Sequence, residues 1–253
     1  MKVSGNTILI TGGSSGIGLA MAEILAETGN KVIICGRDEK KLQMRQNEIN
    51  SITAYSCDIS KKTDCESLFT RVTSDFPDVN ILVNNAGIQK EIDFKAGASE
   101  LLTVESELDI NLGASIYLSA LFVPYFLDQK KECAIVNVTS GLAFIPLQVV
   151  PIYCATKAGL HSFSMSLRYQ LANTNIKVFE IIPPIVQTDL HRGKVARTQA
   201  KRGISAKRVA KETLKAFKND HFEKTIGQAR DLKIASRIAP HFFSGLLNKM
   251  ISN

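Results

Sequence analysis

The amino-acid sequence predicts a single α/β domain in which a doubly wound parallel sheet lies between two layers of helices. Short runs rich in β-branched residues alternate with amphipathic stretches, which is the pattern of consecutive βαβ units. A glycine-rich turn joins the first such run to the first amphipathic stretch. The chain has 253 residues, 45% hydrophobic and 22% charged, so it can bury one full core. This composition excludes collagen-like polymers and disorder.

Each expected element is bounded by a local signal, such as Gly29, which follows the first helical stretch as a C-cap does. The expected strands cover 7–11, 31–35, 51–57, 81–84, 134–139 and 177–182. The expected helices cover 18–28, 38–49, 61–75, 100–127, 154–172 and 206–218. A polar, basic loop is expected over 190–203, and an amphipathic tail near 232–253 is expected to pack on a partner subunit or beside the site. No repeat or linker divides the domain, which covers 1–253.

Cysteine usage and hydropathy indicate a soluble, cytoplasmic protein. The five cysteines are an odd number without metal-ligand spacing, so neither a disulfide framework nor a metal site is expected. Residues 1–15 lack the pattern of a signal peptide. The uncharged stretches 110–127 and 133–157 are interrupted by Asn, Ser and Pro and do not read as continuous apolar spans.

Positive charge is concentrated at the end of the chain. The net charge is +7, and residues 190–253 hold 15 Lys/Arg against 4 Asp/Glu. Such asymmetry can mark contact with nucleic acid or a membrane surface, and the alternative is a solvated basic face that attracts an anionic ligand. No aromatic-interleaved or groove-reading motif accompanies the charge, so the sequence favours the solvated face. Peripheral membrane contact of the tail is the weaker alternative.

The glycine-rich turn TGGSSGIG predicts a phosphate-binding loop of the Rossmann-like kind. It lies between a strand and a helix, where the helix N-terminus offers unpaired N–H groups to phosphates. Gly12 permits the tight turn, and Gly16 and Gly18 remove side chains where backbone approaches a pyrophosphate or packs on the sheet. The spacing G-x-x-x-G-x-G differs from the common fingerprint. The predicted loop residues are Gly12, Ser14, Ser15, Gly16, Ile17 and Gly18.

Residues after the next strands predict how a dinucleotide would be selected. Arg37 follows the second strand where an acid would favour NAD(H), so NADP(H) is expected and NAD(H) is the alternative. Asp58, with Ile59 beside it, follows the third strand and can accept from an adenine amino group. The turn Asn85-Ala86-Gly87 follows the fourth strand, at the edge where open α/β sheets bind ligands.

Tyr153 and Lys157 are four residues apart and share one helical face, and Ser140 lies at the end of the fifth strand. A free tyrosine has a pKa of about 10, and a nearby ammonium group favours the phenolate. Tyr153 is therefore expected to exchange a proton with a carbonyl or alcohol oxygen, and Ser140 to stabilise charge on that oxygen. A Y-x-x-x-K pair alone is also common as a structural feature, so the order of the motifs carries the interpretation.

The set TGGSSGIG, NNAG, Asn111, Ser140 and YCATK resembles the single-domain branch of the short-chain dehydrogenase/reductase family, over about residues 5–230. Several segments are especially similar to bacterial oxidoreductases of the DltE type. The resemblance implies a catalytic tetrad of Asn111, Ser140, Tyr153 and Lys157, in which the Asn distorts its helix and the Lys also grips the nicotinamide ribose. It further implies cofactor contacts from Val186 and Thr188, a homodimer or homotetramer, and hydride transfer between NADP(H) and a small carbonyl or alcohol substrate.

Two departures from the family pattern are visible, and the pocket is predicted only by position. Pro184 stands where the family commonly has glycine, which stiffens the loop, and Ser15 stands where many NADP-using relatives carry a basic residue. A substrate loop is expected near 187–205. The candidate substrate residues are Leu142, Gln148, Ile185 and Leu190. The rival reading is a cofactor-binding regulator or redox sensor without turnover, which need not retain the catalytic set.

Overall fold

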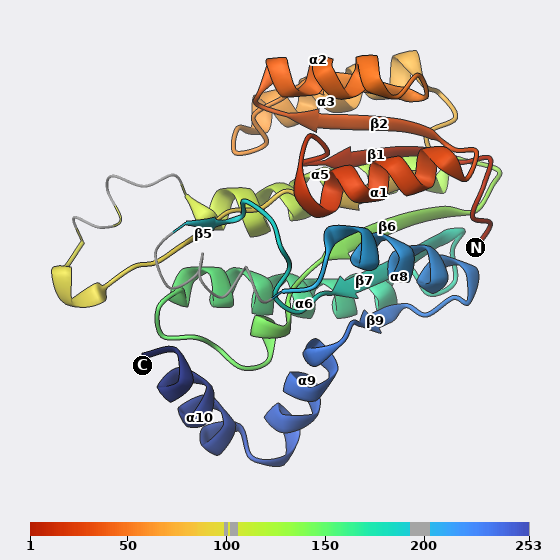
Figure 1. Cartoon of the computed structure of the whole chain (residues 1–253). Coiled ribbons are helices and arrows are strands. Elements are labelled where there is room, and N and C mark those ends of the chain that lie inside the picture. The colour runs from red at the N-terminus through yellow and green to blue at the C-terminus, as the bar shows by residue number, and fades with distance from the viewer. Residues whose placement is uncertain (99–100, 102–105, 193–202, 253) are drawn as a thin grey trace.

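The computed structural model describes residues 1–98, 101, 106–192 and 203–252. Its centre is a seven-stranded, wholly parallel sheet in the order β3-β2-β1-β4-β6-β7-β9 (Figure 1). The strands are β1 Thr7–Thr11, β2 Lys31–Gly36, β3 Ile52–Ser56, β4 Ile81–Asn84, β6 Cys133–Val138, β7 Ile176–Ile182 and β9 Glu223–Thr225. All six expected strands are confirmed. Strand β9 escaped prediction because its three residues, Glu-Lys-Thr, carry no hydrophobic pattern.

Helices cover both faces of the sheet, which confirms the predicted three-layer, doubly wound α/β architecture (Figure 1). Ile8 and Ile10 of β1 enter one core, and Leu9 between them enters the other, because successive strand residues point to opposite faces. The helices on the first face are α1 Gly16–Glu27, α2 Glu39–Glu48 and α8 Ala206–Lys218. Those on the second face are α3 Lys62–Asp75, α5 Ala114–Leu127 and α6 Pro151–Gln170.

The helix expected over 100–127 is regular only in its second half. A π-helical turn, η2, covers Leu108–Gly113 and leads into α5. Residues 99–100 and 102–105 lie outside the described residues. The stretch Leu108–Leu127 is long and apolar enough to cross a membrane by length and composition alone. Its residues Leu118, Phe122 and Phe126 are fully buried in the second core, which is what a core helix of a globular domain shows.

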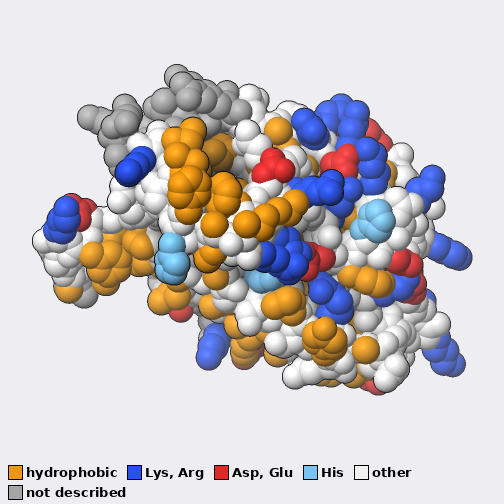
Figure 2. Space-filling view, turned by 90° about the horizontal axis from the view of Figure 1, so that it is seen from below, with side chains coloured by type: hydrophobic (Ala, Val, Ile, Leu, Met, Phe, Trp, Pro, Cys, Tyr) orange, Lys and Arg blue, Asp and Glu red, His pale blue; other side chains and the backbone are white. Residues whose placement is uncertain are grey.

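The C-terminal tail forms two helices, α9 Gln228–Ile238 and α10 Pro240–Ser252. Asn248 of α10 fastens the tail to the segment before α6: its Oδ1 accepts from the Gln148 amide (2.7 Å) and its Nδ2 donates to the Pro146 carbonyl (3.2 Å). The predicted amphipathic tail therefore packs beside the site. On the face seen from below, hydrophobic side chains gather next to Lys and Arg side chains (Figure 2).

The remaining elements are short and lie around the carboxyl edge of the sheet. They are the paired strands β5 Gln89–Lys90 and β8 His191–Arg192, and the 3₁₀ turns η1 Phe94–Ala96 and η3 Gly141–Ala143. Strand β8 lies in the predicted substrate loop, of which residues 193–202 fall outside the described residues.

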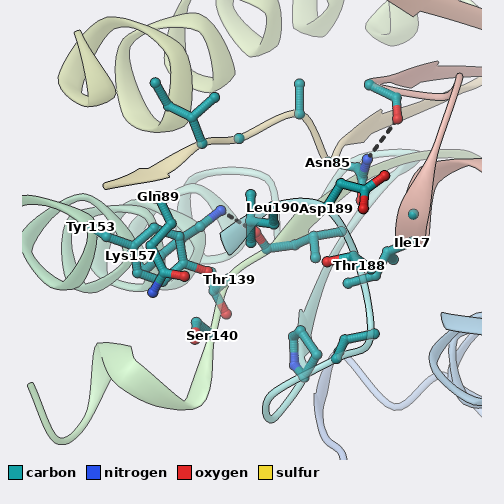
Figure 3. A pocket seen from close by; sticks show the side chains of 18 of the residues that line it. Ile17, Asn85, Gln89, Thr139, Ser140, Tyr153, Lys157, Thr188, Asp189 and Leu190 are labelled. Atoms are coloured by element: carbon teal, nitrogen blue, oxygen red, sulfur yellow. Dashed lines mark hydrogen bonds between the residues drawn. The ribbon is translucent and has the colours of Figure 1, made fainter. Parts of the chain in front are cut away.

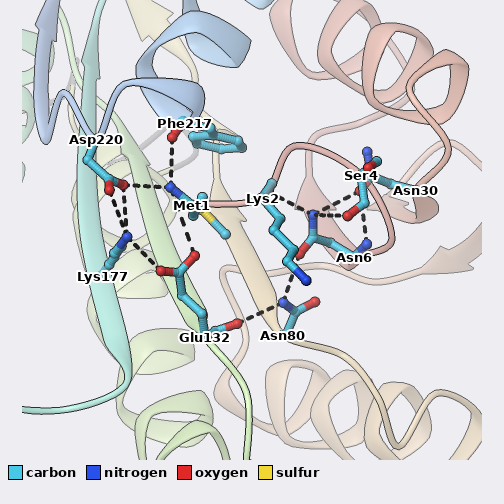
Figure 4. Close-up of polar contacts among 10 residues, drawn as sticks. All are labelled: Met1, Lys2, Ser4, Asn6, Asn30, Asn80, Glu132, Lys177, Phe217 and Asp220. Carbon is cyan, nitrogen blue, oxygen red and sulfur yellow. Dashed lines mark hydrogen bonds and ion pairs between the residues drawn. The ribbon is translucent and has the colours of Figure 1, made fainter.

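A buried amide cluster joins the amino ends of three strands at the edge opposite the site (Figure 4). Asn80 Oδ1 accepts from the Thr7 amide (3.0 Å), and its Nδ2 donates to Asn6 Oδ1 (3.0 Å) and to the Glu132 carbonyl (2.9 Å). Asn30 Oδ1 in turn accepts from the Asn6 amide (3.0 Å). Every polar atom of the Asn80 side chain is thus hydrogen-bonded. These bonds fix the register of β1, β4 and β6 at the amino ends of the three strands.

We expect Asn80→Ala to lower the free energy of unfolding by about 2–4 kcal/mol, because it leaves a buried amide and a buried carbonyl without partners. Urea unfolding monitored by circular dichroism measures the change. Asn47→Ala, at an exposed position on α2, is the control and should stay within about 0.5 kcal/mol of the wild type. A loss at Asn80 as small as that of the control would contradict the role assigned to the cluster.

Candidate active site

A cavity of about 810 Å³ opens at the carboxyl edge of the sheet, where predicted residues from distant parts of the chain meet (Figure 3). Its position is the one expected of ligand sites in doubly wound folds. Nineteen of the predicted residues line it: Gly12, Ser14, Ser15, Gly16, Ile17, Arg37, Asp58, Ile59, Asn85, Ala86, Gly87, Ser140, Leu142, Tyr153, Lys157, Ile185, Val186, Thr188 and Leu190.

The glycine loop is shaped by close backbone contacts. Gly12 has φ +65°, and a Cβ there would lie 2.9 Å from Ala86 Cα. A Cβ at Gly18 would lie 2.4 Å from the Gly12 carbonyl oxygen, so Gly18 serves packing behind the loop and does not line the cavity. Thr11 Oγ1 accepts from the amides of Asn85 and Ala86 (3.0 Å each), which ties the NNAG turn to the loop.

The amino end of α1 faces the cavity as a cradle for an anion. Ser15 is the N-cap residue, yet its side chain makes no capping hydrogen bond, and the first turn of α1 holds no acidic residue. Gly16, at φ +57°, would bring a Cβ within 3.2 Å of Thr188 Cγ2. Free N–H groups and the positive end of the helix dipole fit the phosphates of a dinucleotide.

Two cations and two carboxylates, those of Asp38 and Asp58, line one end of the cavity. Arg37 and Lys41 both line it, and Lys41 Nζ lies 3.7 Å from Asp38 Oδ2. The pKa of Asp58 is lowered: burial acts to raise it, but hydrogen bonds from Ser60 and the charges of Arg37 and Lys61 prevail. Asp58 is thus held as a hydrogen-bond acceptor. Lys41, in the first turn of α2, follows Arg37 by four residues and was not predicted from the sequence.

Ser140, Tyr153 and Lys157 meet on the opposite side of the cavity (Figure 3). Ser140 follows the end of β6 by two residues, and its Oγ accepts from the Leu142 amide (3.1 Å). Lys157 Nζ donates to the Val138 carbonyl (2.8 Å) and lies 5.7 Å from the centre of the Tyr153 ring. These contacts bind the middle of α6 to the end of β6, so both elements present their polar groups to one point.

Burial shifts the pKa values of Tyr153 and Lys157. It raises the pKa of Tyr153, although a hydrogen bond with Ser140 acts to lower it, and it lowers the pKa of Lys157 to about 8. The expectation that the Lys157 ammonium would favour the phenolate is therefore outweighed by burial in this structure. A raised pKa means that the Tyr153 hydroxyl keeps its proton at neutral pH.

Asn111 lies behind the cavity wall, in the π-helical turn η2, and is fully buried. Its Oδ1 accepts from the Ile88 amide (2.8 Å), and its Nδ2 donates to the Ile88 carbonyl (2.8 Å) and to Thr156 Oγ1 (3.2 Å). It thus joins η2 and α6 to the segment after the NNAG turn. The distorted helix that the resemblance implied at this residue is present.

A family model described as short chain dehydrogenase matches residues 6–199. The chain belongs to the short-chain dehydrogenase/reductase family. It is 47% identical over 240 residues to the uncharacterized oxidoreductase DltE of Bacillus subtilis, with 94% of each chain covered, which confirms the predicted DltE-type resemblance. It is 36% identical over 193 residues to the 3-oxoacyl-[acyl-carrier-protein] reductase FabG of Rickettsia prowazekii, with 75% of this chain and 76% of that relative covered.

Solved structures of the short-chain dehydrogenase/reductase family have the same fold. One from Burkholderia phymatum in complex with NAD superposes with a TM-score of 0.84 at 22% identity, covering 98% of this chain and 96% of that one. A 3-ketoacyl-(acyl-carrier-protein) reductase from Brucella melitensis complexed with NADH gives a TM-score of 0.78 at 27% identity, covering 90% and 100%. The family and these neighbours support a nicotinamide cofactor.

The substrate side of this reductase-family site differs in part from the prediction. Gln148, predicted to line it, lies outside the cavity with an exposed side chain, because its buried neighbour Leu147 takes the inward position. The apolar periodicity of the tail near 232–253 was the sequence signal that could have predicted the part of the cavity wall formed by α9 and α10. The lining residues that the sequence analysis missed on this side are Gln89, Leu147, Val149, Val150, Asp189, Gln228, Asp231, Leu232, Leu247 and Met250.

Glu107, just before η2, is a buried carboxyl group near the tetrad. Its Oε1 accepts from the Lys90 amide (3.3 Å), and its Oε2 has no hydrogen-bond partner among the described residues. Burial raises the pKa of Glu107 to about 7, against the opposing effect of Lys90. Its charge acts on Tyr153 and raises the pKa of that hydroxyl further.

The free energy of unfolding should therefore depend on pH through Glu107. A carboxyl whose pKa is higher in the folded than in the unfolded chain costs stability as pH rises from about 4.5 to about 7. Glu107→Gln keeps the acceptor and cannot ionise, so relative to wild type it should gain on the order of 1–3 kcal/mol between pH 5 and pH 8. Urea titrations at both pH values measure this gain. Glu39→Gln, at an exposed site, is the control; equal pH dependence in both variants would contradict the assignment.

Proposed function

We propose that this protein is an NADP(H)-dependent oxidoreductase that moves hydride between the nicotinamide and a carbonyl/alcohol pair. One observation carries the proposal: a buried, protonated Tyr153 with Ser140 and Lys157 shares a single cavity with an anion-binding helix end flanked by Arg37 and Lys41. The cofactor, when bound, supplies or accepts the hydride at the substrate carbon. Arginine and lysine beside the ribose end suit a 2′-phosphate.

The residues of the chain provide the proton and the polarisation. In reduction, Tyr153 donates its hydroxyl proton to the carbonyl oxygen as the carbon receives hydride, and the oxidation of an alcohol reverses both transfers. Ser140 hydrogen-bonds the same oxygen and stabilises the charge that develops on it. Lys157, with a pKa of about 8, can return a proton to Tyr153 near neutral pH.

The substrate side suits an apolar carbonyl compound. Leu142, Leu147, Leu190, Leu232 and Leu247 line this side and come from four separate segments of the chain. Both the Rickettsia relative and the Brucella neighbour are reductases of an oxoacyl group by name, which supports a carbonyl substrate here.

The rival function, a cofactor-binding regulator without turnover, is less favoured by the site. A sensor would need the glycine loop alone, whereas in this chain Ser140, Tyr153 and Lys157 also line the same cavity. Binding of NADPH without turnover of any carbonyl compound would restore the rival.

We also propose a homodimer or homotetramer built on α5 and α6, as the family resemblance implies. Their outer faces expose Ile116, Leu127, Met165 and Tyr169, the last at 85%. Light scattering after size exclusion would test the oligomeric state.

Cofactor choice is tested by removing the cations. Arg37→Ala should raise the Kd for NADPH about 10- to 100-fold, since a hydrogen bond to a charged group contributes about 1.5–3 kcal/mol, and should leave the Kd for NADH nearly unchanged. Lys41→Ala should act in the same direction, and Lys40→Ala, exposed but outside the cavity, should have no effect. Fluorescence titration gives each Kd. Equal weakening for both cofactors would rule out a 2′-phosphate contact.

The proposed role of Tyr153 in catalysis is tested by removing its hydroxyl group. Tyr153→Phe should lower kcat about 100- to 10,000-fold for NADPH oxidation with a panel of apolar aldehydes and ketones, because the proton donor is lost. The Kd for NADPH should change little, since the glycine loop and α1 are intact. Tyr55→Phe, which removes a hydroxyl group outside the cavity, is the matched control. Undiminished turnover in Tyr153→Phe would refute the role of this residue.

A further inference from the structure

Glu180 is a carboxyl group at the centre of the molecule that the proposed chemistry does not use. It lies in the middle of β7 and is 0% exposed. Its Oε1 accepts from Thr139 Oγ1 (2.7 Å), and both carboxyl oxygens lie 2.9 Å from His161 Nδ1. A hydrogen bond joins the His161 ring to the Glu180 carboxyl group, and the imidazole tautomer decides which of the two donates.

The two partners of Glu180 are neighbours of catalytic residues. Thr139 directly precedes Ser140 at the end of β6, and His161 follows Lys157 by four residues, one turn further along α6. Glu180 therefore joins the strand that presents the serine to the helix that presents Tyr153 and Lys157. The hydrogen bond from Lys157 to Val138 joins the same two elements on the cavity side.

The surroundings of Glu180 hold it in one place. The Phe144 ring packs edge-on against His161 with ring centres 5.0 Å apart, and Lys233 of α9 lies 5.7 Å from the centre of the Phe144 ring. The charge of Glu180 also acts on Arg168 and on Lys233. A carboxyl group with donors or cations from β6, α6 and α9 has little freedom to move, so the elements it joins are held in register.

We infer that Glu180 and His161 form a positioning pair that sets the separation of Ser140 from Tyr153. The inference rests on the proposed function, because its kinetic consequence needs the reductase reaction. The pair touches neither cofactor nor substrate. Displacement of a reacting group by about 1 Å costs on the order of 100-fold in rate. The hydrogen bonds of Glu180, which hold β6 and α6 together, therefore affect kcat.

The test compares variants that remove the hydrogen bond between Glu180 and His161 with variants that keep it. Glu180→Leu and His161→Leu abolish the contact and should lower kcat about 10- to 100-fold, with the Kd for NADPH changed less than threefold. Glu180→Gln keeps the Oε1 acceptor, and His161→Asn keeps a donor near the Nδ1 position. Both should retain kcat within about threefold of wild type. Thr139→Val removes the bond from Thr139 to Glu180, together with a longer contact of the same hydroxyl to the Ile181 carbonyl (3.5 Å), and covers the case in which a leucine variant does not fold.

Asn80→Ala is the control for a general loss of stability, because it breaks a buried polar cluster at the far edge of the sheet. It should lower the melting temperature without changing kcat. If Glu180→Leu and His161→Leu lower only the melting temperature, or if Glu180→Gln and His161→Asn lose as much kcat as the leucine variants, the positioning role is wrong.

Crystal structures of the same variants separate this inference from the proposed function. Glu180→Leu or Thr139→Val should lengthen the distance from Ser140 Oγ to the Tyr153 hydroxyl by more than about 0.5 Å, whereas Asn80→Ala should not. If the wild type reduces no carbonyl compound, the proposed function fails and this distance still decides the inference. An unchanged distance in the leucine and valine variants overturns it.

Discussion

The close backbone approach at Gly12, Gly18 and Ala86 is the constraint on which the rest of the site depends. Where a side chain would collide with a carbonyl oxygen at 2.4 Å, only glycine lets α1 begin so near the end of β1. Thr11 then ties the next turn, Asn85-Ala86, to the same loop. The amino end of α1, the Asn85-Ala86 turn and the backbone that leads to Ile88 and Asn111 are all placed by that junction, so backbone packing gives this part of the cavity its shape.

The parts of the structure that the sequence predicts are those in which local pattern and global packing agree. The TILIT run and its glycine loop carry a strand, a turn and a helix end within twelve residues, and each signal supports the others. The placement of Ser140, Tyr153 and Lys157 followed from strand order and helical spacing. Asn111 was assigned only through family resemblance, because a polar residue inside a helix carries no local signal of its role.

What escaped prediction depends on contacts between distant segments. Strand β9 exists because the edge of β7 offers it hydrogen bonds, although its own residues have no strand pattern. Gln148 and Leu147 are adjacent, and which one faces the cavity is decided by the backbone course between η3 and α6. The raised pKa of Tyr153 is a property of the folded environment, since burial outweighs the nearby ammonium group that the sequence makes visible.

The hydrogen bonds of Asn248 attach the last helix to the segment before α6. Through them, the last helix supplies Leu247 and Met250 to the cavity wall, and Leu247 packs against the small cluster of buried residues that includes Tyr153. One part of the cavity wall is thus encoded at the end of the chain, whereas the glycine loop and the Asn85-Ala86-Gly87 turn line another part from the first ninety residues. A substitution at Leu247 therefore changes the cavity wall and the packing around Tyr153 together, so α10 couples the shape of the pocket to the surroundings of that hydroxyl group.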